Sequence, residues 1–108
     1  MERRRLEKIN ELIHRFIGDL LRRELDVEAL VTVYGVNTSA NGQDATVSIT
    51  VYPFEKSEEI LKEVQKNIYE IQQKLNRGLR IRPVPKITFK IDESEEKGSK
   101  ILHTIDKL

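Results

Sequence analysis

The chain has 108 residues, a net charge of +1, no cysteine and a charged-residue share of 34%. This length fits one domain without a second core, and the lack of cysteine excludes disulfides, thiolate metal sites and cysteine nucleophiles. No stretch approaches the ~20 apolar residues that cross a bilayer, and the charged first residues do not form a signal peptide. We therefore expect a single domain over residues 1–108, located in the cytoplasm, with no membrane partner.

An amphipathic helix is predicted from Glu2 to Glu24. Its apolar residues recur at helical spacing and fall in one sector: Leu6, Ile9, Ile13, Phe16, Ile17, Leu20 and Leu21. Arg4, Lys8 and Arg15 line the opposite side, interrupted by acids. This side is either a basic surface or a solvated face with i,i+4 ion pairs.

Two strands are predicted next, from Leu30 to Asn37 and from Ala45 to Tyr52. Apolar and polar side chains alternate along the second strand, as one buried and one exposed face require. Gly35 marks a bulge in the first strand. Asn41-Gly42 is a strong reverse-turn signal, so we expect the two strands to pair as an antiparallel hairpin.

A long helix is predicted from Ser57, its N-cap, to Arg77, with Gly78 following as the C′ residue. The prolines of Arg82–Pro85 favour an extended linker, which leads into a third strand from Lys86 to Asp92. Residues 92–108 are expected to form a loosely packed tail with a short terminal helix. The fold class is therefore α+β, in the order α-β-β-α-β.

Several strings in this order carry a resemblance. They are Thr32-Val33-Tyr34-Gly35-Val36, Ala45-Thr46-Val47, Leu79-Arg80-Ile81-Arg82-Pro83-Val84-Pro85-Lys86-Ile87-Thr88-Phe89 and Asp92-Glu93-Ser94. With the Arg-rich first helix they resemble the ribosome-binding factor A family over nearly the whole chain. The resemblance implies a type II KH-like domain with its helices on one face of a three-stranded sheet. It also implies a factor that binds the small ribosomal subunit and its ribosomal RNA during late maturation and cold adaptation.

The chain departs from the family's usual pattern at three points. Family members usually have an Ala-x-Gly kink in the long helix, where this chain has Asn67-Ile68-Tyr69. The usual Asp-Pro-Arg after the first helix is Asp26-Val27-Glu28 here, and the Ser-x-Asp after the first strand is Ser39-Ala40-Asn41. The sequence therefore leaves open whether the long helix is kinked near Asn67 and whether a contact to RNA depends on such a kink.

The main candidate for RNA binding is the segment from Ile71 to Ile91, which has cations and no acid: Lys74, Arg77, Arg80, Arg82, Lys86 and Lys90. Arginine suits phosphates because its planar guanidinium donates two hydrogen bonds at once. We expect Arg77, Arg80 and Arg82 to be the first contacts. The further candidates are Lys74, Lys66, Arg4, Lys8, Arg15, Lys86 and Lys90. The alternative for Lys86 and Lys90 is the polar side of a strand protected by charge.

Aromatic residues suited to base stacking are few. Those outside predicted core positions are Tyr34, Tyr52, Phe54 and Tyr69. We interpret Tyr34 and Tyr52 as cross-strand neighbours. Recognition of RNA shape and backbone is therefore expected, more than recognition of bases.

Catalysis has little support in the sequence. His14 and His103 lie in no catalytic signature, and His103 with Asp106 is at most half a metal site. We predict a non-enzymatic, monomeric factor without metal, cofactor or small-molecule substrate. Two alternatives remain: a general KH-like RNA-binding module without ribosomal specificity, and a protein-interaction domain that uses its charged helix faces.

Overall fold

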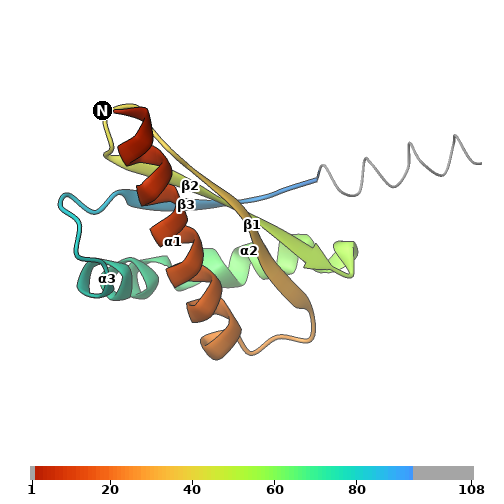
Figure 1. Ribbon diagram of the computed structural model, residues 1–108. Coiled ribbons are helices and arrows are strands. Elements are labelled where there is room, and N and C mark those ends of the chain that lie inside the picture. The colour runs from red at the N-terminus through yellow and green to blue at the C-terminus, as the bar shows by residue number, and fades with distance from the viewer. Residues whose placement is uncertain (1, 94–108) are drawn as a thin grey trace, which may run out of the picture.

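The computed structural model describes residues 2–93, and Figure 1 shows the arrangement of their helices and strands. The elements are α1 (Arg3–Glu24), β1 (Leu30–Thr38), β2 (Asp44–Tyr52), the 3₁₀ turn η1 (Phe54–Lys56), α2 (Ser57–Lys66), α3 (Ile68–Gly78) and β3 (Lys86–Ile91). The predicted α+β class is confirmed. The predicted terminal helix lies outside the described residues.

The sheet has the order β1-β2-β3, with β2 in the centre. β1 and β2 are antiparallel, as predicted, and their register shifts between Val33 and Gly35, which confirms the bulge. Gly42 adopts a φ of 75° in the turn, a conformation that favours glycine. β3 joins β2 in parallel, so α2 and α3 form the crossover connection between these two strands.

The helices cover one face of the sheet. Figure 1 shows α2 and α3 below the strands and α1 running diagonally across the sheet. On that face Val47, Ile49 and Ile87 are at most 1% exposed, and they join one apolar cluster with side chains from all three helices. Burying each such side chain contributes about 1.5–3 kcal/mol. The other face of the sheet is uncovered, and we call it the open face.

The prediction of one long helix from Ser57 is wrong, because the helix is interrupted at Asn67. This residue has φ −101° and ψ 12° and separates α2 from α3. Its backbone N–H donates to Val64 O at 3.1 Å, a tighter turn than an α-helix makes, and its Nδ2 donates to Glu63 O at 2.8 Å. α3 therefore leaves the direction of α2 (Figure 1) and packs against α1, whereas α2 packs on β2 and β3.

Both predicted caps of the long helix are also wrong. Ser57 is the first residue of α2 and follows η1 directly, so it does not hold the N-cap position. Its side chain is buried, and its Oγ has no hydrogen-bond partner among the described residues. Gly78 is the last residue of α3, and Leu79 follows it with extended backbone. Neither end of the helical region therefore uses the capping chemistry that its residue type suggested.

Candidate nucleic-acid interface

The predicted arginines lie at the end of α3 and in the linker Leu79–Pro85. Arg77, Arg80 and Arg82 are all exposed, and neither Arg77 nor Arg80 has an ion-pair partner within residues 2–93. Arg82 Nη1 donates to Leu79 O at 3.0 Å and to Ile81 O at 2.6 Å. Arg82 therefore braces the linker, and the remaining N–H groups of its guanidinium stay available. We call Arg77, Arg80 and Arg82 the arginine patch.

The linker that presents Arg80 and Arg82 is fixed at both ends. Leu79 is 7% exposed, and Pro85 is among the fully buried side chains. Gln72 of α3 donates from Nε2 to Pro85 O at 3.0 Å and accepts at Oε1 from the Ile87 N–H at 2.9 Å. One side chain thus holds the last residue of the linker and the second residue of β3. A fixed linker loses less conformational entropy when it binds a partner.

α3 is held against α1 by two contacts. A Cβ at Gly78 would overlap the ring of Phe16, so glycine is needed for close approach and not for a special φ. Lys74 Nζ donates to both carboxylate oxygens of Glu24, at 2.6 and 2.7 Å. Lys74, one of the predicted RNA contacts, therefore already has an anionic partner from α1.

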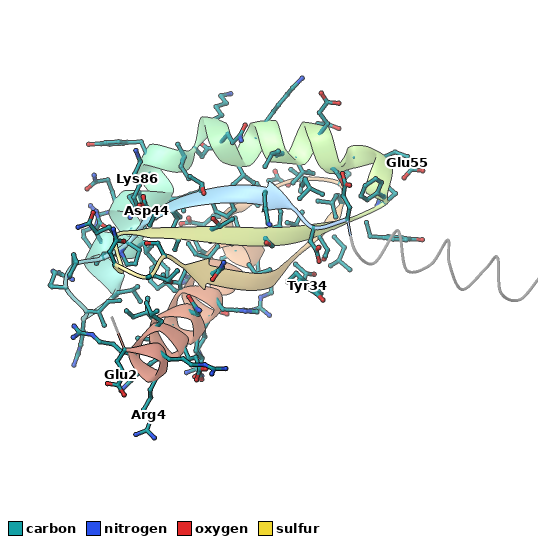
Figure 2. The ribbon with its side chains drawn as sticks, turned by 90° about the horizontal axis from the view of Figure 1, so that it is seen from above. Glu2, Arg4, Tyr34, Asp44, Glu55 and Lys86 are labelled. Atoms are coloured by element: carbon teal, nitrogen blue, oxygen red, sulfur yellow. The ribbon has the colours of Figure 1, made fainter. Side chains whose placement is uncertain are left out.

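The sheet lysines lie on a different surface from the arginine patch. Lys86 and Lys90 are exposed on the open face, where Lys86 pairs across the sheet with Asp44 and Lys90 with Ser48. Figure 2 looks onto this face and shows Lys86 beside Asp44. The six cations between Ile71 and Ile91 are thus divided between α3, the linker and the open face of the sheet.

The predicted cations of α1 and α2 are also spread out. Lys66 lines a shallow hollow of α2 with Glu55, Glu58, Glu59, Lys62 and Glu63. Arg15 pairs with Glu11 at 3.1 Å and lines a groove between α1 and β1. Arg4 and Lys8 are exposed, and Arg4 points away from the body of the protein in Figure 2. None of these cations is joined to the arginine patch by a contact within the described residues.

Sequence reasoning missed the roles of Gln72 and Gly78. Gln72 bonds to Pro85 and Ile87, and Gly78 lies against Phe16. Neither role has a signal in the sequence, because these partners lie in other elements of the fold.

The interpretation of Tyr34 and Tyr52 as cross-strand neighbours is wrong. Tyr52 pairs with Leu30, and Tyr34 lies inside the bulge of β1. Both rings are exposed on or beside the open face, by 61% for Tyr34 and 76% for Tyr52. Tyr69 of α3 is also 76% exposed.

Residues 2–93 offer neither a metal site nor a membrane span. No cluster of three or more His, Cys, Asp or Glu side chains suited to a metal ion occurs there. No helix in the same range is long and apolar enough to cross a bilayer.

The sequence model of the ribosome-binding factor A family matches residues 5–105. The chain belongs to this family. The ribosome-binding factor A of Natranaerobius thermophilus is 34% identical over 100 residues, which cover 90% of this chain and 76% of that protein. The one from Prochlorococcus marinus strain NATL1A is 32% identical in an alignment 110 residues long, which covers 97% of this chain and 89% of the relative.

Solved structures of the family share the fold. The crystal structure of ribosome-binding factor A from Thermus thermophilus superposes with a TM-score of 0.71 at 20% identity, over 80% of this chain and 94% of that one. A homology model of the Thermus protein has been fitted into a cryo-electron-microscopy map of its complex with the 30S subunit. This chain superposes on it with a TM-score of 0.67 at 20% identity, over 78% of this chain and 91% of that one. The predicted KH-like order of elements is therefore confirmed.

Proposed function

We propose that this protein is a non-catalytic assembly factor that binds the small ribosomal subunit in the cytoplasm and contacts its ribosomal RNA through the arginine patch. Membership of the ribosome-binding factor A family supports the ribosomal partner. The fitting of the Thermus relative into a map of a 30S complex supports the small subunit. The observation that carries the RNA contact is the exposure of Arg77 at the end of α3 and of Arg80 on the linker that Gln72 holds in place. Neither arginine has an acidic partner within residues 2–93.

Such a surface acts by binding alone. If three arginines neutralise three phosphates, the logarithm of the association constant falls with the logarithm of salt concentration with a slope of about −2 to −3. A factor that binds one conformation of immature RNA more tightly than others shifts the population towards it without any chemical step.

Co-sedimentation with isolated small subunits tests the proposal. The double variant Arg77→Gln with Arg80→Gln is compared with the matched double variant Lys86→Gln with Lys90→Gln. Each variant removes two positive charges from exposed positions. The first removes them from the arginine patch, and the second removes them from the open face. We expect the arginine variant to lose at least tenfold in affinity, because two phosphate contacts vanish, and the lysine variant to stay close to wild type. Circular dichroism confirms that both variants are folded.

Three outcomes would change the assignment. Equal binding by the two double variants would remove the arginine patch from the interface. Equal binding of free RNA and subunits, without preference for immature particles, would favour a general KH-like module. An affinity that salt hardly changes would point to a partner other than a nucleic acid.

A further inference from the structure

Tyr69 is the exposed aromatic residue that shares an element with the arginine patch. It lies in the first turn of α3, directly after the interruption at Asn67, and is 76% exposed. Tyr69, Gln73 and Arg77 are spaced at i, i+4 and i+8, so they form one stripe on α3. The opposite side of α3 carries the buried Ile71 and Leu75. Tyr69 and Arg77 are about 12 Å apart along the helix axis.

The interruption at Asn67 gives Tyr69 this position. Residues before Asn67 belong to α2, whose exposed surface carries three glutamates and two lysines. The chain turns at Asn67, whose side-chain Nδ2 donates a hydrogen bond to Glu63 O. Tyr69 therefore lies in the first turn of a new helix, α3, the same helix that carries Arg77. In an uninterrupted helix Tyr69 and Arg77 would keep the same spacing, but their stripe would follow the direction of α2.

We infer that Tyr69 stacks on an unpaired base of RNA whose phosphates lie along α3 towards Arg77 and Arg80. Every base offers a π-face to an aromatic ring, whereas only bases outside a duplex expose that face. The inference rests on the proposed function and names its ligand more closely: a single-stranded, looped or bulged segment of RNA, and not a continuous double helix. Recognition then includes a base as well as the backbone.

Tyr52 provides a matched control within the same chain. It has the same exposed fraction as Tyr69, 76%, but it lies on β2 next to Leu30 on the open face. The two rings therefore differ in their distance from the arginines and not in their accessibility.

The test measures binding of a short single-stranded oligoribonucleotide, of the same oligonucleotide made with abasic sugars, and of isolated small subunits. Tyr69→Ala is expected to weaken binding of the base-bearing strand roughly 5- to 100-fold and to leave binding of the abasic strand unchanged. Tyr69→Phe keeps the ring and should retain wild-type affinity. Tyr52→Ala should bind like wild type. On small subunits Tyr69→Ala should also bind more weakly than Tyr69→Phe.

Several results would overturn the inference. They are an unchanged affinity in Tyr69→Ala, an equal loss on the abasic strand, or a larger loss in Tyr52→Ala. A wild-type protein that bound subunits but no single-stranded RNA would do the same. If the arginine double variant lost binding while Tyr69→Ala did not, only the stacking would fail, and the proposed function would stand.

Discussion

α2 and α3 are two halves of one amphipathic sequence, yet they differ in packing and in charge. α2 packs on β2 and β3, whereas α3 meets α1. α2 has three acids and two lysines, while α3 with the linker to Pro85 has one acid and four cations. The interruption at Asn67 separates the two halves. The turn at Asn67 uses neither glycine nor proline. It allows α2 to cover the sheet while α3 and the linker present the arginines.

Distance also separates the acids of α2 from the arginine patch. α3 has 11 residues, which span about 16 Å. Exposed charges are largely screened beyond about 8 Å at physiological ionic strength. The acids of α2 therefore weaken the field at Arg80 only slightly, and the nearly neutral chain still offers a locally positive surface.

The largest expected effect concerns the side chain that fixes the linker to α3. Gln72→Leu leaves the Pro85 carbonyl and the Ile87 N–H without their partner, so the free energy of unfolding should fall by about 1–3 kcal/mol. Gln65→Leu on the exposed side of α2 is the control and should stay within about 0.5 kcal/mol of wild type. Urea denaturation measures both. Equal losses in the two variants would show that Gln72 has no special role.

The contact between α3 and α1 depends on the absence of a side chain at Gly78. Gly78→Ala forces the ring of Phe16 to move, which costs about 1–3 kcal/mol and is offset by about 1 kcal/mol of helix propensity. A net loss of about 1 kcal/mol is expected in chemical denaturation. Combining Gly78→Ala with Phe16→Leu should give a smaller loss than the sum of the single variants, because Leu leaves room for the new methyl group. A strictly additive result would argue against the contact.

The turn between the two halves is held by the side chain of Asn67 and by tertiary packing. Asn67→Ala removes the hydrogen bond to Glu63 O, so a loss of about 0.5–1.5 kcal/mol is expected in thermal unfolding. The helical signal in circular dichroism should not rise, since α3 stays packed on α1. Greater helicity together with greater stability would show instead that Asn67 alone interrupts the helix.

The smallest expected effect is the change in RNA binding on replacing Lys74, compared with that on replacing Arg77 in the same helix. Lys74 is paired with Glu24, so its charge is already balanced by an acid of the protein. Lys74→Gln should therefore change RNA affinity by less than about twofold. Arg77→Gln should reduce the salt slope of binding by about 1. Titrations at several salt concentrations distinguish these cases. A reduced slope in both variants would place Lys74 in the interface despite its partner.

Most of the fold could be predicted from the sequence because its signals are local. The alternation along β2, the Asn41-Gly42 turn and the bulge at Gly35 each depend on neighbouring residues, and the structure confirms all three. The break at Asn67 was not predictable in this way, since the apolar spacing continues through it. Ser57 and Gly78 were assigned as caps from residue type, but η1 and the ring of Phe16 determine what these residues do.

The sequence by itself determined the element order, the family and the cluster of cations between Ile71 and Ile91. Only the tertiary structure decided how those cations divide. Lys74 meets an acid fifty residues away in the chain, and Lys86 and Lys90 lie on the open face. The arginine patch remains exposed at the end of α3 and on the fixed linker. The physical reason is that charge pairing depends on distances in space, and these are set when the helices pack on the sheet.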